Sequence, residues 1–321
     1  MSLIHPTSVI IACVLAIAIG GCARTISQVD VPPPPPPIFD VATPSIEELA
    51  AAINRTDAVR ELSTNSARVD VLSMPAVPKL TASMHLRRQK SFRLRASLPI
   101  MMGTGLDLGS NDNEFWFEVP EGMSQTLYYA NHDQYSAQLD RAILPVDPSW
   151  MIQAIGLPRL DTNKVSRDGV VARRDGMLEV RTLEPSPAGT YQRVMLIEPS
   201  AGYVTHLFLY APDMRLVAKS IASKHQYYDT VDVVLPHEVK VELFPASGPP
   251  LAMQMEIDRY TVNQLLSGDP QLFVMPTTAR RFDLVQLAGG ASSMIGNRSA
   301  VPPSRPVSQY SAKAELGTKL R

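Results

Sequence analysis

The sequence predicts a mostly β (α+β) domain: a strongly curved antiparallel sheet of about ten strands, an unclosed half-barrel with covering helices. Three observations support this fold class. About ten segments alternate apolar and polar residues with a period of two, as half-buried strands do. Short turns rich in Pro, Gly, Asn and Asp join them without a helix between each pair, which indicates a continuous antiparallel sheet. Two stretches with helical character interrupt this pattern.

The first helical stretch is predicted from Thr43 to Leu62. Ser45 and Glu48 fit a capping box at its start. The apolar residues that share one face are Ile46, Leu49, Ala50 and Ile53. This helix is therefore amphipathic and needs a surface to cover.

The strands follow from about Ser66 onward. In residues 91–98 the apolar set is Phe92, Leu94, Ala96 and Leu98, and it alternates with Arg93, Arg95 and Ser97. One face of this strand is thus predicted to be apolar and the other charged. Comparable alternation occurs in residues 66–73, 81–88, 113–119, 177–183, 191–198, 203–210, 215–222, 237–244 and 251–258. In the third of these, Trp116 lies on the face opposite Phe115 and Phe117.

A second helix is predicted halfway along the chain, in the stretch VDPSWMIQAIG. Asp147 suits the cap, Pro148 the first helical position and Gly156 the residue after the end. Its apolar residues include Trp150, Met151 and Ile155. A second helix is therefore expected to meet the sheet.

The amino terminus carries a signal of another kind. The apolar run Val9–Ile19 is too short to span a bilayer, which takes roughly twenty residues, but suits a secretory signal peptide. The boundary Ile19-Gly20-Gly21-Cys22 resembles the lipobox of bacterial lipoproteins. This resemblance implies removal of residues 1–21 and acylation of Cys22. The alternatives are an ordinary signal peptide cut near Ala23 or a buried thiol.

Localisation and linkers follow from this resemblance. Two or more acyl chains would hold the protein stably on a membrane. Ala23 stands where Asp would favour retention in the inner membrane, by resemblance to enterobacterial sorting, so we expect an exported lipoprotein of the outer membrane that faces the periplasm.

Residues 22–43 are predicted to form an anchor and linker, in which Pro32–Pro37 predicts a stiff polyproline II spacer or, alternatively, a ligand for an aromatic groove. Residues 44–287 form the domain, and residues 288–321 are predicted to be a disordered basic tail.

Composition and motifs disfavour several functions. Lys and Arg total 30 against 31 Asp and Glu, so no net field attracts nucleic acid. The six histidines lack metal-ligand spacing, and no GxSxG, HExxH or Walker sequence occurs. Gly103, Gly105 and Gly109 resemble a phosphate-binding loop only faintly, because they lead into a strand. We therefore expect no catalytic residues, metal or cofactor, and infer no oligomeric state.

The order of elements, an amphipathic helix and then alternating strands with a helical insertion, resembles the lipoprotein-carrier family of the LolA/LolB type over about residues 44–276. The local segments that carry the resemblance are KSFRLRA, NEFWFEVP, TLYYANHD and LPHEVKVELF. The resemblance implies an unclosed curved sheet with helices over its concave face, an apolar cavity for acyl chains, and no catalytic residue.

The predicted function depends on whether this concave face leaves a hollow. A half-barrel offers more concave area than two helices fill, which favours a hollow of lipid dimensions. The many Met, Leu and Val residues could equally fill it. The candidate residues of an apolar cavity or patch are Phe92, Leu94, Leu98, Phe115, Trp116, Phe117, Trp150 and Met151. We predict a non-catalytic lipoprotein that binds acyl chains or a lipidated client; the alternative is a structural or assembly lipoprotein with a filled core and a protein-binding surface.

Overall fold

The computed structural model describes residues 33–97, 105–121, 124–137, 146, 149–187, 189–246, 248–277 and 280–287. The chain divides into two compact units, Met1–Pro34 and Pro35–Arg321, and every described helix and strand belongs to the second. The predicted signal peptide, the lipobox with Cys22, residue Leu98 and the predicted basic tail lie outside the described residues. Among the helices that are described, none is long and apolar enough to cross a membrane.

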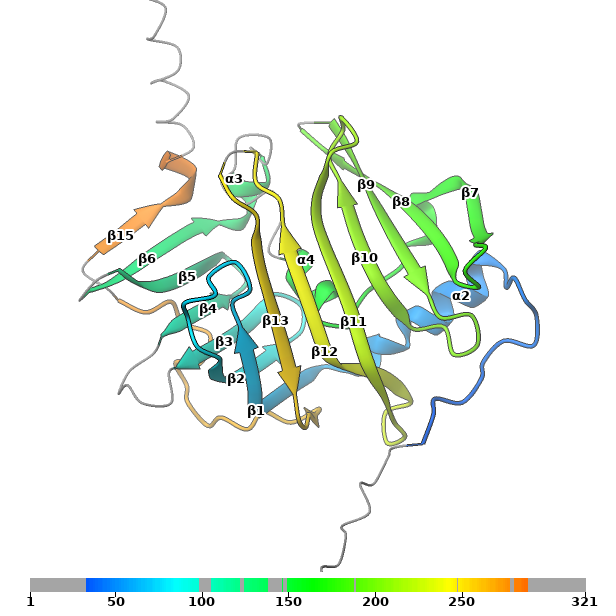
Figure 1. Cartoon of the computed structure of the whole chain (residues 1–321), viewed down its shortest axis with the longest axis horizontal. Helices are drawn as coiled ribbons and strands as arrows, with labels where there is room; N and C mark the ends of the chain where they lie inside the picture. The colour runs from blue at the N-terminus through cyan, green and yellow to red at the C-terminus, as the bar shows by residue number, and fades with distance from the viewer. Residues whose placement is uncertain are drawn as a thin grey trace, which may run out of the picture. The chain divides into compact units, whose positions relative to one another are not determined.

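The described strands form one open, curved sheet of fifteen strands (Figure 1). Their order is β15-β6-β5-β4-β3-β2-β1-β13-β12-β11-β10-β9-β8-β7, and β14 pairs with β1 off this path. The bounds are β1 Glu61–Asp70, β2 Leu80–Arg87, β3 Ser91–Ser97, β4 Leu106–Ser110, β5 Glu114–Glu121, β6 Ser124–Asn131, β7 Val165–Ala172, β8 Leu178–Ser186, β9 Gly189–Ile197, β10 Val204–Tyr210, β11 Leu216–Tyr228, β12 Val233–Leu243, β13 Leu251–Ile257, β14 Thr261–Val262 and β15 Arg280–Asp283. Neighbours pair antiparallel except β15 and β6, which are parallel.

The predicted fold class is confirmed, but the number of strands is higher than the ten expected. The five strands that alternation did not predict are β4, β6, β7, β14 and β15. In β7, Gly169 has a positive φ of 63°, and the pairing with β8 shifts between Val165 and Val170. A glycine and an irregular register interrupt the two-residue period, which explains why alternation does not reveal this edge strand.

The first helix, α2, spans Ile46–Ile53 and starts with the predicted capping box. The backbone N–H of Ser45 donates to the Glu48 carboxylate at 2.8 Å, and the Glu48 N–H donates to Ser45 Oγ at 3.2 Å. The helix ends well before Leu62, however, because the 3₁₀ turn η1 (Asn54–Ala58) and then β1 follow it. The Asn54 side chain holds the backbone of Leu160 through two hydrogen bonds of 2.9 Å, so a tertiary contact replaces the predicted continuation.

Three short helical elements lie between β6 and β7: α3 (His132–Ser136), α4 (Ser149–Ala154) and the 3₁₀ turn η2 (Thr162–Lys164). The predicted second helix is confirmed as α4, although Asp147 and Pro148 lie outside the described residues. Gly156 ends it with a φ of 108°. A Cβ at this glycine would lie 2.4 Å from the ring of Pro236, so both the backbone angle and the close approach require glycine.

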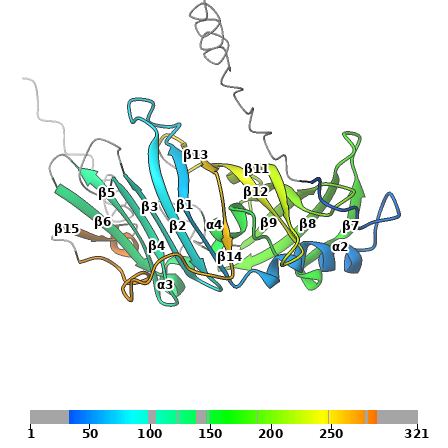
Figure 2. The same ribbon diagram turned by 90° about the horizontal axis from the view of Figure 1, so that it is seen from below.

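The core lies on the concave face, where α2 and α4 cover the sheet (Figure 2). One cluster of buried residues packs α2 and the α4 residues Trp150 and Ala154 on strands β8–β12. A second packs Ile152 of α4 and Ile155, which follows it, on β1–β3, β12 and β13. A third and smaller cluster consists of Phe115, Ala130, Tyr135 and Leu284. Side chains therefore meet across much of the concave face, and a binding site must lie where the clusters leave room.

A strap, residues 263–277, follows β14 and contacts the opposite face of the sheet at β1 and β3. Arg93 was predicted to lie on a charged face of its strand, yet its side chain is only 3% exposed. It forms a two-point ion pair with Asp107, with Nε donating to Oδ1 at 2.6 Å. Its Nη1 donates to the carbonyls of Leu272 and Val274 in the strap at 3.1 and 2.8 Å. The strap therefore buries a residue that strand alternation alone assigns to the charged face.

Candidate binding cavity

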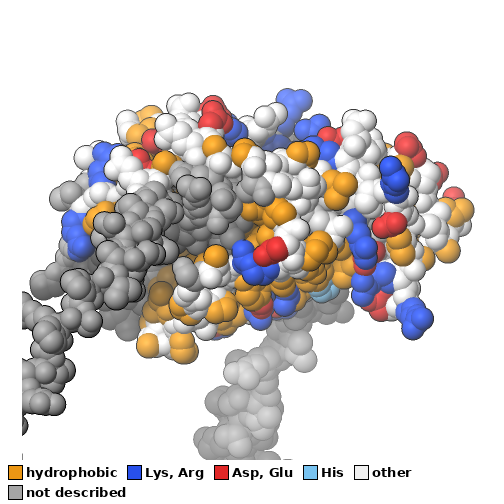
Figure 3. All heavy atoms as spheres, turned by 90° about the horizontal axis from the view of Figure 1, so that it is seen from above, with side chains coloured by type: hydrophobic (Ala, Val, Ile, Leu, Met, Phe, Trp, Pro, Cys, Tyr) orange, Lys and Arg blue, Asp and Glu red, His pale blue; other side chains and the backbone are white. Residues whose placement is uncertain are grey.

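A cavity of about 1000 Å³ lies at one end of the concave face. The described residues of its wall belong to α2, α3, α4, residues 159–161, the turn η2, and strands β8, β9 and β10. This volume is at the upper end of the range for small-molecule sites, about 300–1,000 Å³. Figure 3 views the molecule from above, and on the side that it shows apolar side chains gather near the middle among charges of both signs. The concave face therefore leaves a hollow despite its three packed clusters.

One side of the cavity wall is apolar. It consists of Ala50 from α2, Trp150 from α4, Leu160, Tyr191 from β9 and Leu209 from β10. All five also belong to the first core cluster. Because alternate residues of a strand point to the same face, Tyr191 projects to the same side as Met195 and Ile197, which complete the packing beneath it. An apolar ligand chain in this cavity would lie on rigid, buried side chains.

The other side of the cavity wall carries charges around Arg193, which is 6% exposed. Arg193 Nε donates to Thr182 Oγ1 at 3.1 Å, and Nη1 donates to Gln153 Oε1 of α4. Its Nη2 lies 3.4 Å from Glu184 Oε1, and the other oxygen of Glu184 is 2.7 Å from Lys164 Nζ. Burial lowers the pKa of Arg193, while the carboxylates of Glu184 and Asp161 raise it. The cavity is thus amphiphilic, whereas the sequence predicts an apolar hollow.

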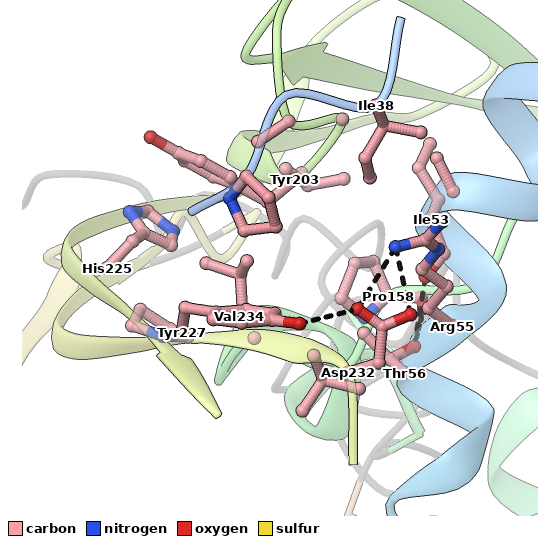
Figure 4. Close-up of a pocket in the computed structure, with 18 residues that line it drawn as sticks. Ile38, Ile53, Arg55, Thr56, Pro158, Tyr203, His225, Tyr227, Asp232 and Val234 are labelled. Atoms are coloured by element: carbon pink, nitrogen blue, oxygen red, sulfur yellow. Dashed lines mark hydrogen bonds and ion pairs between the residues drawn. The ribbon is translucent and has the colours of Figure 1, made fainter. Parts of the chain in front are cut away.

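A second hollow is smaller and lies where the linker meets the domain (Figure 4). Its volume of about 30 Å³ has room for one or two water molecules at most. Pro36 and Ile38 line it together with Tyr203, His225 and Tyr227, and the Ile38 N–H donates to the carbonyl of Ser200 at 2.8 Å. Part of the proline run therefore lies against aromatic side chains of its own domain.

The floor of this small hollow is a polar network. Asp232 forms an ion pair with Arg55 at 3.0 Å and accepts a hydrogen bond from the Tyr227 hydroxyl at 3.0 Å (Figure 4). The rings of His225 and Tyr203 lie 4.2 Å apart, and burial lowers the pKa of His225 to about 4. The histidine is therefore neutral at physiological pH. We assign this hollow to the docked linker, because a lipid chain does not fit there.

The structure separates the eight residues predicted to line an apolar cavity or patch. Trp150 lines the cavity, and Met151 packs against the first core cluster. Phe92 and Leu94 are buried in the second cluster, and Phe115 is buried in the third. The remaining described members, Trp116 and Phe117, lie on opposite faces of β5, and Leu98 lies outside the described residues. Of the described members, Trp150 alone lines the cavity.

Trp116 and Phe117 have separate surroundings. Trp116 is 2% exposed on the face under the strap, where the Arg93 guanidinium lies 5.2 Å from its ring centroid. Phe117 lies on the concave face and stacks on Tyr128 at 4.9 Å, and Tyr128 stacks on Phe282 at 5.6 Å. Core packing thus accounts for Trp116, whereas Phe117 belongs to a half-buried aromatic stack near the β15 edge.

The charged residues of the cavity were missed by sequence reasoning, although one signal for them existed. In YQRVMLIE, Arg193 occupies the same phase of the strand as Tyr191, Met195 and Ile197. A charge in the apolar phase of a strand marks a side chain that must find partners within the protein. Among the described residues, no group of three or more His, Cys, Asp or Glu side chains is placed to hold a metal ion.

No family model matches the chain, and no curated protein matches it. It is similar to the crystal structure of a DUF1329 family protein from Desulfovibrio piger at 13% identity, with a TM-score of 0.44 over 69% of this chain and 93% of the other. The chain is also similar to a putative outer membrane lipoprotein-sorting protein domain from Vibrio parahaemolyticus, at 9% identity and a TM-score of 0.45 over 71% of this chain and 95% of the other. A LolA superfamily protein from Nitrosomonas europaea is 11% identical, with a TM-score of 0.39 over 72% of this chain and 98% of the other. TM-scores below 0.5 at these identities assign no function to this chain.

Proposed function

We propose that this protein is an exported lipoprotein, anchored to the outer membrane through Cys22, whose cavity holds an acyl chain of a lipid or lipidated client. It transports or inserts that chain without catalysis. The observation that supports this most strongly is the hollow of about 1000 Å³ walled on one side by Trp150, Leu160 and Leu209.

The energetics of burial favour a chain-like ligand. Each methylene moved from water into an apolar site contributes about 0.8 kcal/mol, so ten buried methylenes contribute about 8 kcal/mol. A net binding free energy of that size corresponds to a Kd of about 1 μM, and the freedom lost on association reduces it. A carrier needs such reversible binding, because it must also release its ligand.

Filling the cavity tests the proposal directly. Ala50 lies on the cavity wall in α2, whereas its neighbour Ala51 is exposed. We expect Ala50→Trp, made in the full chain with Cys22→Ser, to reduce uptake of a fluorescent fatty acid at least about tenfold. Ala51→Trp, with the same change in the same helix, should leave uptake unchanged. Equal uptake by both variants, at equal helix content by circular dichroism, would contradict a ligand site in this cavity.

The anchor has its own test. If Cys22 is acylated, Cys22→Ser should move the protein from the membrane fraction to the soluble fraction, because two or more acyl chains supply the stable attachment. Cys13→Ser lies within the predicted leader and serves as the matched control, which should stay membrane-bound. Retention of the Cys22→Ser protein on membranes would refute the anchor and leave the cavity proposal untouched.

A second candidate function, an assembly protein of the envelope, is favoured by one feature. The aromatic stack of Phe117, Tyr128 and Phe282 ends at the edge strand β15, where Phe282 is 36% exposed. Exposed aromatic side chains beside a strand that ends the sheet, as β15 does among the described residues, suit a protein partner. If the wild-type chain takes up no fatty acid in the uptake experiment above, and Phe282→Ser abolishes capture of an envelope protein, this second function would replace the carrier.

A further inference from the structure

The charged side of the cavity indicates what kind of head group the ligand carries. Arg193 is buried in the cavity wall at the same strand phase as Tyr191, so its guanidinium lies beside the apolar surface that would hold a chain. A buried cation is costly unless hydrogen bonds and opposite charge surround it. Arg193 therefore needs partners within the cavity wall.

The guanidinium of Arg193 has more donors than partners among the described residues. An arginine carries five N–H groups in a fixed fork and no acceptor. Its Nε and Nη1 donate to Thr182 and Gln153, and its Nη2 lies 3.4 Å from Glu184 Oε1. Five N–H groups thus face three partners. Guanidinium donors that are not used within the protein suit an oxyanion.

Two cations and two carboxylates meet around Arg193. Glu184 is shared, because its two oxygens face Arg193 and Lys164 at 3.4 and 2.7 Å. The Asp161 carboxylate is also near enough to raise the pKa of Arg193, so these four side chains together carry no net charge. The ammonium of Lys164 also has three donors and spends one on Glu184.

The other charged residues of the wall are exposed. Asp161 accepts hydrogen bonds from the backbone and side chain of Asn163 at 3.0 and 3.2 Å, where it caps η2. The side chain of Arg159 is 67% exposed and lies 3.7 Å from Asp57. Asp133 is exposed in the first turn of α3. Of the charged wall residues that the structure describes, Arg193 alone is buried, so the wall offers an anion hydrogen-bond donors rather than an excess of positive charge.

We propose that the ligand is a single-chain amphiphile with an anionic oxyacid head, a carboxylate or a phosphate monoester, which binds Arg193 and Lys164 while its chain lies on Trp150, Leu160 and Leu209. This inference rests on the proposed function, since it names the ligand of the same cavity. Arg193 and Lys164 act as specificity-determining residues: they select the head, and the apolar wall holds the chain.

Three probes with one chain length and different heads test the inference: palmitate, hexadecyl phosphate and hexadecanol. Binding to the full chain carrying Cys22→Ser is measured by isothermal titration calorimetry below the micelle concentration of each probe. We expect palmitate or hexadecyl phosphate to bind at least about tenfold more tightly than hexadecanol, because charge-assisted hydrogen bonds exceed neutral ones. The tighter of the two identifies the carboxylate or the phosphate as the preferred head.

Variants separate head recognition from folding. Arg193→Gln should lower the affinity for the anionic probe at least about tenfold and leave hexadecanol binding unchanged. Lys164→Gln should lower anion affinity less, and it serves as the main variant if Arg193→Gln does not fold. Arg68→Gln is the matched control, because Arg68 lies on β1 outside the cavity and its side chain is 50% exposed; this variant should bind all three probes as the unsubstituted chain does.

Each outcome decides a different claim. If the unsubstituted chain binds hexadecanol as tightly as the anionic probes, or if Arg193→Gln weakens all probes equally, the head-group inference is wrong and the chain-binding cavity stands. If the unsubstituted chain binds none of the three probes, the proposed function fails and the inference fails with it.

Discussion

The buried ion pair of Arg93 with Asp107, which lies under the strap, allows one prediction in quantitative detail. Replacing Asp107 by alanine removes the carboxylate that Arg93 holds at two points, while both side chains are about 95% or more buried. Breaking a buried pair by removing one partner costs about 3–5 kcal/mol, since it leaves an uncompensated charge. Arg93 keeps its bonds to the carbonyls of Leu272 and Val274, so we expect about 3 kcal/mol, the lower end of that range.

The assay is equilibrium unfolding in urea, with a matched exposed pair as the control. Arg68 and Asp258 are 2.9 Å apart but 50% and 53% exposed, so Asp258→Ala should cost less than about 1 kcal/mol. Replacing both partners of the buried pair, in Arg93→Leu with Asp107→Leu, should restore part of the loss, because no unpaired charge remains. A loss below about 1 kcal/mol for Asp107→Ala would refute the role assigned to this ion pair.

Two further predictions concern stability. Gly109→Ala should lower the free energy of unfolding by about 1–3 kcal/mol, because a Cβ there would lie 2.1 Å from the Trp116 ring. Gly268→Ala is the control and should be nearly neutral in the same urea assay, because its Cβ would meet nothing within 4 Å. Equal effects of the two variants would contradict this packing. For His225, the folded pKa of about 4 lies below its ordinary value of 6.5, so stability is fully present above pH 6.5 and is lost as pH falls toward 4. The loss is at most about 3 kcal/mol. The free energy of unfolding should therefore fall less between pH 7 and pH 4.5 for His225→Gln than for the wild type. Equal falls in the two proteins would contradict this role of His225.

Local patterns predicted those parts of the fold that local chemistry determines. The capping box of Ser45 and Glu48 formed as expected, and Gly156 ended α4. Phe92 and Leu94 are buried on the face that their alternation predicts. These features depend on neighbours within a few residues, so the order of residues contains the required information.

Features that depend on distant segments could not be predicted in this way. Arg93 is buried because the strap, about 180 residues later, covers it. β4 contains Gly109, which resembled part of a loop, yet its glycine is needed because the indole of Trp116 lies across it from the next strand. The intrinsic propensity of a residue for a strand or a turn does not include its tertiary contacts, and tertiary contacts determine these two positions.

The candidate site shows the same division. Trp150 was identified because it lies on a helix with readable ends, and it does line the cavity. Arg193, Glu184 and Lys164 come from β9, β8 and the turn η2, and their charges converge only once the sheet has curved over α4. Trp150 on the apolar side of the cavity was foreseeable from the sequence, and the charged side was not.

The central claim is that the cavity holds an acyl chain in the protein as it is made in the cell. Native mass spectrometry of the Cys22→Ser chain, purified without detergent, tests this most directly. The account predicts one bound lipid per chain, lost in Ala50→Trp and retained in Ala51→Trp. A chain that carries no lipid and takes up none when palmitate is added would contradict it.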